Sequence, residues 1–112
     1  MKSGTSKWNP EKTQVLEAAQ LMAQKGLVAG TSGNVSMRID SGDGRELIAI
    51  TPNALYYDRM GVDDIVVADF EGNNVEGELR LSIEKMLHIG IYKARKKVNA
   101  VIHSHPVYGN IL

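Results

Sequence analysis

Apolar positions near the start of the chain recur at helical spacing between Pro10 and Lys25. The repeat consists of Val15, Ala18, Ala19, Met22 and Ala23. Proline suits the first turn of a helix, and Gly26 is a natural terminator. We therefore predict a helix over residues 10–25, preceded by a flexible lead-in over residues 1–9.

Short apolar runs further along the chain predict a sheet. The runs are VSMRI (35–39), ELIAIT (46–51), IVVADF (65–70), a short strand around Val75, and NAVIHSH (99–105). The turn sequence DSGDG predicts that the first two strands form a hairpin. The segments 26–34 and 51–64 have no such periodicity, and we expect loops there.

A second helix is predicted over Ser82–Lys96, between the last two strands. Its apolar stripe consists of Ile83, Met86, Leu87, Gly90, Ile91 and Ala94. The resulting order, α-β-β-β-(β)-α-β, predicts a single sheet-centred α/β domain over residues 10–112.

Composition narrows the function classes. The 112 residues include 13 basic and 13 acidic side chains, so no charge excess points to nucleic acid or an anionic membrane. The absence of cysteine excludes disulfides and thiolate metal sites, which is compatible with a cytoplasmic enzyme. No apolar run approaches the roughly 20 residues of a membrane span. A chain this short buries a limited core, so oligomerisation is plausible.

Two of the three histidines, His103 and His105, follow one apolar strand at alternate positions. Alternate strand residues share a face, so two imidazoles could bind one metal ion there. A catalytic zinc normally takes three protein ligands and a water, so two histidines leave the site incomplete. Half-buried histidines that close a strand are the alternative.

Glu84 falls in the first turn of the second predicted helix, with Ser82 as a candidate N-cap. The helix N-terminus favours an ionised carboxylate, which could act as a general base near a metal. An ordinary first-turn glutamate is the alternative. His88 lies one turn further on, where a Glu–His pair at the surface or in the core is a better interpretation than metal ligation.

The segment GTSGN (30–34) could offer backbone N–H groups to an anion, although it lacks the spacing of a P-loop. A plain helix-to-strand connection is the alternative. Together with Asn34, the side chains of Asn53 and Ser82 could complete a phosphate site. No serine has the sequence context of a nucleophile elbow.

These pieces, in this order, resemble the class II aldolase/adducin family, and within it the L-fuculose-phosphate aldolase branch. The matching stretches are GLVAGTSGNVSMR (26–38), IAITPNALYYDRM (48–60), DDIVVADFEGNNVEG (63–77), LRLSIEKMLHIGIYKAR (79–95) and VNAVIHSHP (98–106). The resemblance implies a three-layer α/β/α sandwich around a mostly antiparallel sheet. It also implies a cytoplasmic homotetramer that binds a small sugar phosphate.

The resemblance assigns roles to individual residues. His103 and His105 would bind zinc, and Glu84 would be the acid/base, where the epimerase branch typically has aspartate. The sugar phosphate would be bound by Gly33, Asn34, Asn53, Ala54 and Ser82. The implied reaction cleaves a sugar phosphate to dihydroxyacetone phosphate and an aldehyde, with the metal as Lewis acid for the enediolate.

Departures from the family pattern leave the substrate open. Asn53 and Ala54 replace the usual Thr/Ser-Gly, and Ile83 replaces a serine, which removes a hydroxyl from the phosphate pocket. An epimerase, dehydratase or decarboxylase on the same scaffold, or a non-catalytic adducin-like interaction module, are the alternatives. The family unit is about twice as long, so we expect this chain to represent its N-terminal portion, without the third zinc histidine.

Overall fold

The computed structural model describes residues 8–25, 34–40, 42, 44–52, 59–77 and 85–103. Its elements are α1 (Asn9–Gln24), β1 (Asn34–Asp40), β2 (Glu46–Ile50), the 3-10 helix η2 (Val62–Asp64), β3 (Val66–Asp69), β4 (Asn74–Glu76), α2 (Lys85–Ala94) and β5 (Ala100–His103). The predicted order of helices and strands is confirmed. Most predicted ends shift by one or two residues, and the start predicted for the second helix, at Ser82, lies outside the described residues.

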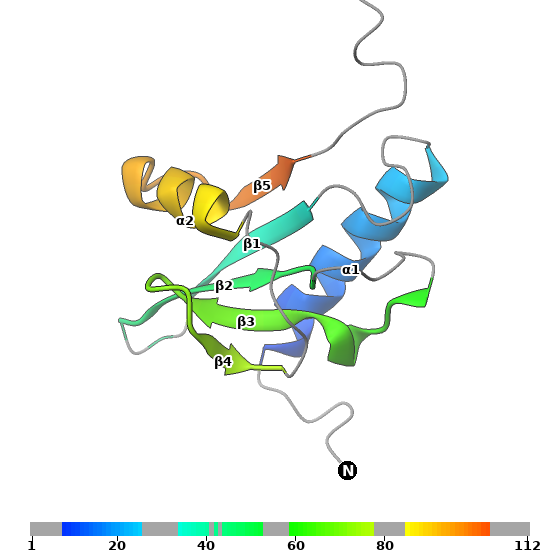
Figure 1. The fold of residues 1–112 in the computed structure, drawn as a ribbon, viewed down its shortest axis with the longest axis horizontal. Coiled ribbons are helices and arrows are strands. Elements are labelled where there is room, and N and C mark those ends of the chain that lie inside the picture. The colour runs from blue at the N-terminus through cyan, green and yellow to red at the C-terminus, as the bar shows by residue number, and fades with distance from the viewer. Residues whose placement is uncertain are drawn as a thin grey trace, which may run out of the picture.

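The five strands form one sheet in the order β4-β3-β2-β1-β5, and every described pairing is antiparallel. Figure 1 shows this sheet with the two helices packed on it. The hairpin predicted at DSGDG is β1–β2, with Ser36 opposite Ile50. The chain then returns from α2 to add β5 beside β1, which makes β1 an interior strand.

The sheet has a hydrophobic core on each face. Leu47 and Ala49 of β2 belong to the core under α1, whereas Ile48 and Ile50 belong to the core under α2. Because both faces are covered, β2 is a nearly continuous apolar run and does not alternate with polar residues. The expected three-layer α/β/α arrangement is therefore confirmed.

Helix α1 uses the face that the sequence predicts. Val15, Ala19 and Met22 are buried against the sheet. Lys12 is also buried, with its ammonium 2.6 Å from a carboxylate oxygen of Glu76 in β4. This ion pair fixes the first turns of α1 to the edge of the sheet formed by β4.

Helix α2 packs with a different face from its apolar stripe. The buried side chains are His88, Ile89 and Tyr92. The described part of the stripe points outward instead. It lines an open groove formed by Met86, Leu87, Gly90, Ile91, Ala94, Arg95 and Val98. An apolar stripe normally marks the packed face of a helix. Here two polar residues are buried because they hydrogen-bond to the sheet, which turns the stripe away from it.

Neither helix in the described part of the chain is long and apolar enough to cross a membrane.

Candidate functional site

The first residue of β1 and the last residue of β5 form the centre of the candidate site. Asn34 lies directly opposite His103 in the antiparallel ladder between these strands. Two residues from separate predicted motifs, the glycine loop and the histidine pair, are thus brought together by strand pairing. Val101, in the apolar run before His103, pairs with Ser36 on the part of the sheet under α2. This pairing fixes the register that brings His103 opposite Asn34.

Asn34 has the surroundings of a binding residue. It is only 3% exposed, and its side-chain oxygen Oδ1 is buried without a hydrogen-bond partner among the described residues. A buried amide oxygen without a partner costs about 1–3 kcal/mol. Native structures rarely leave such atoms unsatisfied unless a ligand, ion or water meets them. Asn34 is therefore suited to bind a polar ligand.

The start of β1 is also held firmly. The backbone amide of Val35 donates to the Thr51 hydroxyl at 3.2 Å, and the Thr51 amide donates to the Val35 carbonyl at 3.0 Å. Thr51 is fully buried and begins the TP motif that leads to Asn53 in the sequence. This pair of bonds links the two predicted phosphate-binding segments next to Asn34.

The other predicted site residues lie largely beyond what the structure describes. Gly33, Asn53, Ala54, Ser82, Glu84 and His105 are outside the described residues, and His103 is described by its backbone only. Among the described side chains, no three His, Asp or Glu residues come together as metal ligands. The predicted roles of these residues stay predictions.

A buried cluster of Ser36, His88 and Tyr92, hereafter the anchor cluster, joins α2 to β1. The Ser36 hydroxyl lies 2.6 Å from His88 Nδ1 and 2.8 Å from the Tyr92 hydroxyl. All three residues are fully buried, so Ser36 is not accessible as a nucleophile despite its contact with an imidazole. His88 is a core residue, as one of the two sequence interpretations predicts; its predicted pairing with Glu84 lies outside the described residues.

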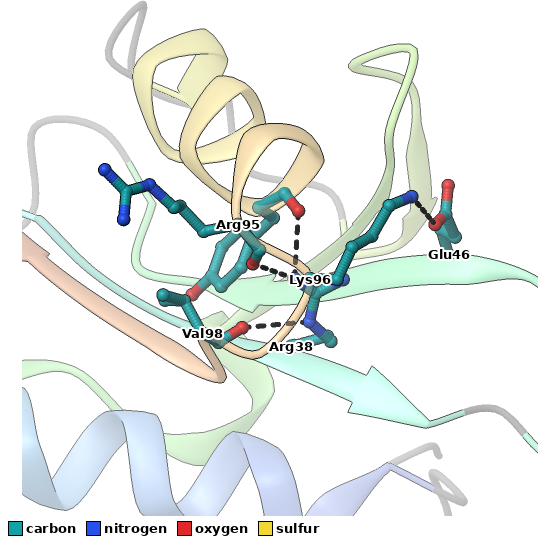
Figure 2. A network of polar contacts seen from close by, with 6 residues as sticks. Arg38, Glu46, Arg95, Lys96 and Val98 are labelled. Carbon is teal, nitrogen blue, oxygen red and sulfur yellow. Dashed lines mark hydrogen bonds and ion pairs between the residues drawn. The ribbon is translucent and has the colours of Figure 1, made fainter.

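Arg38 fastens the C-terminal end of α2. Its guanidinium donates to the carbonyls of Tyr92, Arg95 and Val98 at 3.0, 3.1 and 3.0 Å. Figure 2 shows this group, with the exposed ion pair between Lys96 and Glu46 beside it. The side chain thus satisfies carbonyls that the end of a helix leaves open.

The anchor cluster and Arg38 together fix the direction of α2. Ser36 meets His88 and Tyr92, whereas Arg38, two residues further along β1, meets the carbonyls at the end of the helix. Helix α2 therefore runs in the same sense as β1. Its earlier residues lie toward the Asn34 end of that strand.

Burial raises the pKa of the Tyr92 phenol above its ordinary value of 10.0, although Ser36, Arg38 and the Val101 backbone each act to lower it. Desolvation disfavours the phenolate, so the hydroxyl stays protonated and available for the hydrogen bond to Ser36. Arg38 also lies over the Tyr92 ring, with its guanidinium carbon 5.0 Å from the ring centroid. Tyr92 therefore enters the cluster as a neutral hydroxyl, with the Arg38 cation at its edge.

The sequence signal for the anchor cluster is the polar pair within the first strand. In VSMRI, Ser36 and Arg38 alternate with apolar residues, which predicts one polar face. The structure shows that α2 covers this face, because its own polar residues match it. Sequence reasoning missed Ser36 and Tyr92, since the partner of each is distant in the chain.

Comparison with known proteins identifies relatives of the whole described fold. The pattern of the Class II Aldolase and Adducin N-terminal domain matches residues 13–112. Methylthioribulose-1-phosphate dehydratase from Marinobacter nauticus is 36% identical over 98 residues, which cover 88% of this chain and 45% of the relative. The 5-deoxy-D-ribulose 1-phosphate aldolase of Bacillus thuringiensis serovar kurstaki is 31% identical over 102 residues, covering 91% and 46%.

A solved structure of an L-fuculose 1-phosphate aldolase shares the fold with a TM-score of 0.80 and 34% sequence identity, covering 92% of this chain and 47% of that one. The chain thus spans about half the length of the relatives that it matches. The match over residues 13–112 shows that this chain belongs to the class II aldolase and adducin family.

Proposed function

We propose that this chain contributes the metal-binding and proton-transfer residues of a class II aldolase that cleaves a sugar phosphate to dihydroxyacetone phosphate and an aldehyde. The observation that carries the proposal is the register of Asn34 opposite His103. This pairing supports one site built from a phosphate-binding loop and a metal-binding strand end. Family membership supports the reaction class.

His103 and His105 would hold a divalent cation, with zinc as the expected metal. Neutral imidazole nitrogen is a common zinc ligand, and alternate positions of a strand share a face. The neighbouring Asn34 supports a polar site, because its buried Oδ1 has no protein partner among the described residues. Such a cation supplies Lewis-acid stabilisation of negative charge that develops on a substrate oxygen.

Glu84 would transfer the proton at the substrate carbon. It immediately precedes α2, and the N-terminus of a helix favours an ionised carboxylate. Helix α2 runs in the same sense as β1. His88, four positions after Glu84 in the sequence, contacts Ser36, which is two residues after Asn34. These contacts support a position for Glu84 near the Asn34–His103 pair.

The phosphate of the substrate would be bound by Gly33, Asn34, Asn53, Ala54 and Ser82. Asn53 and Ala54 differ from the usual family residues, and Ile83 removes one hydroxyl. We therefore specify the substrate only as a ketose phosphate of the kinds named for the relatives. The cytoplasmic location and the homotetramer implied by the resemblance also stay predictions.

A dehydratase is the second candidate function, since one relative is named as a methylthioribulose-1-phosphate dehydratase. A 4-epimerase or a decarboxylase would use the same scaffold. The glutamate at position 84 favours the aldolase over the epimerase branch. A non-catalytic adducin-like module is disfavoured, because both His103 and His105 are retained.

Product analysis tests the proposal. The natural gene product, loaded with zinc, is incubated with L-fuculose 1-phosphate, 5-deoxyribulose 1-phosphate and methylthioribulose 1-phosphate, and products are identified by mass spectrometry. We expect dihydroxyacetone phosphate and an aldehyde from at least one substrate, and none after chelation. Loss of water without carbon–carbon cleavage would identify a dehydratase, and an isomer of unchanged mass an epimerase. Either product would contradict the aldolase.

A further inference from the structure

The anchor cluster lies between the segments that carry the proposed catalytic residues. Ser36 is two residues from Asn34 on β1, a distance of about 6–7 Å along a strand. His88 lies in the first turn of α2, which begins at Lys85, and follows Glu84 by four positions in the sequence. The 2.6 Å contact between Ser36 and His88 is therefore a short, direct connection between these two segments.

Apart from the anchor cluster and the Arg38 bonds at its C-terminal end, α2 has few contacts that could set its position along β1. Only His88, Ile89 and Tyr92 of this helix are buried, and Met86 and Leu87 are about half exposed. Ile89 packs in an apolar core of aliphatic side chains with Phe70 and Tyr92, and apolar packing alone is less directional than hydrogen bonding. Hydrogen bonds between buried groups are directional, and leaving one partner unsatisfied costs about 1–3 kcal/mol. The register of α2 on β1 is therefore set mainly by polar contacts.

A second polar contact holds the residue next to Glu84. The Lys85 ammonium donates to the Gly72 carbonyl at 3.0 Å, in the turn between β3 and β4. The Asp69 carboxylate shapes that turn, because it accepts hydrogen bonds from the backbone amides of Glu71 and Asn73 at 3.0 and 2.9 Å. The first turn of α2 is thus held by polar contacts both to the β3–β4 turn and to β1.

We propose that the anchor cluster of Ser36, His88 and Tyr92 is a positioning device, which fixes the start of α2, and with it Glu84, relative to the Asn34–His103 pair. The inference rests on the proposed function for the role of Glu84. Proton transfer requires the base within hydrogen-bond reach of the substrate carbon. A displacement of about 1 Å by a remote change can lower turnover about 100-fold. The cluster thus acts on catalysis without touching the substrate.

The test uses substitutions that separate the position of α2 from overall stability. Ser36→Ala removes the hydroxyl that both partners share. His88→Asn keeps an amide near the position of Nδ1, whereas His88→Gln moves it toward the position of Nε2. Tyr92→Phe leaves the Ser36–His88 bond intact. Val15→Ala, in the core on the opposite face of the sheet, is the stability-matched control.

Turnover of the zinc-loaded natural gene product is measured with whichever of the three sugar phosphates it cleaves. For Ser36→Ala and His88→Gln we expect kcat to fall about 10- to 100-fold, with KM and metal content close to wild type. His88→Asn should recover most of the lost kcat, and Tyr92→Phe should lose little. Val15→Ala should lower the unfolding midpoint while kcat is retained. Equal losses of kcat in Ser36→Ala and Val15→Ala would overturn the positioning role.

Amide hydrogen exchange provides a readout that does not need turnover. In Ser36→Ala, the amides of α2 from Lys85 to Ile89 should exchange faster, while those of α1 remain protected. Unchanged exchange in α2 would overturn the positioning role. If the wild-type protein cleaves none of the sugar phosphates but Ser36→Ala still exchanges faster in α2, the proposed function fails and the anchoring of α2 stands.

Discussion

Asn34 and His103 lie directly opposite each other in the ladder between β1 and β5. The pairing joins the end of the glycine loop to the first histidine of the H-x-H motif. Asn34 is buried with an amide oxygen that has no partner in the described part of the protein. The relationship makes this end of the two strands the place where a metal and a phosphate could be bound together.

Removal of both histidines should abolish metal binding. The double variant His103→Ala/His105→Ala is expected to bind no zinc by isothermal titration, because both proposed imidazole ligands are lost. In the wild type, affinity should weaken as the pH is lowered, since protons compete for the ligand nitrogens. Lys96→Gln, which changes an exposed residue, is the control and should bind normally. Unchanged stoichiometry in the double variant would refute this assignment.

Glu84→Gln should remove turnover without removing the metal. The substitution keeps the shape of the side chain but eliminates the proton acceptor, and general acid–base roles are worth about 10²–10⁴ in rate. Zinc content is measured alongside kcat. The control is Glu46→Gln, the same change at an exposed residue, which should retain wild-type kcat. A Glu84→Gln variant with turnover near that of wild type would exclude this residue as the base.

The architecture is predictable from the sequence wherever apolar periodicity decides it. The α1 face follows from Val15, Ala19 and Met22, and the β1–β2 hairpin follows from its turn sequence. The packed face of α2 is not predictable in this way. The buried hydroxyl of Tyr92 and the buried imidazole of His88 both find their hydrogen-bonding partner in Ser36, more than fifty positions away in the chain. Periodicity contains no information about such distant polar pairs.

The candidate site is likewise predictable from the sequence only in part. The sequence identifies Asn34 and His103 as candidates by motif, but their adjacency depends on the register of β5 beside β1. The buried, unpartnered Oδ1 of Asn34 is likewise a property of the folded chain. Family resemblance assigns the roles, and strand pairing supplies the proximity.

Tyr92 should make stability sensitive to alkaline pH. Burial raises its pKa above 10.0 in the folded protein, so between pH 10 and the higher folded value only the unfolded chain ionises. The contribution of Tyr92 to the free energy of unfolding is complete below pH 10. It is lost as the pH rises through the pKa of Tyr92 in the folded protein. Urea unfolding of wild type and Tyr92→Phe from pH 8 to 11 should therefore show a smaller alkaline loss in the variant. Parallel curves would show that Tyr92 is not the group responsible.

The Lys12–Glu76 ion pair should contribute to stability. The Lys12 side chain is 4% exposed and its Glu76 partner 32% exposed, so a substitution at Glu76 leaves a buried ammonium poorly compensated. We expect Glu76→Gln to lower the free energy of unfolding by about 1–3 kcal/mol in urea titrations. Lys12→Met should cost less, because it leaves no buried charge. The prediction fails if Lys12→Met is the more destabilising of the two.

The most direct test of the site is to locate a bound metal within the fold. Cobalt(II) is added to the isotopically labelled protein, and paramagnetic shifts of the backbone amides are measured by NMR. The account predicts the largest shifts at residues 103–105 and, across the ladder, at Asn34 and Val35, with clear shifts at the start of α2. Asp40 lies at the other end of β1, about 20 Å away, and should shift little. The largest shifts at any other place in the fold, or the same shifts after His103→Ala/His105→Ala, would contradict a metal site at this end of the strands.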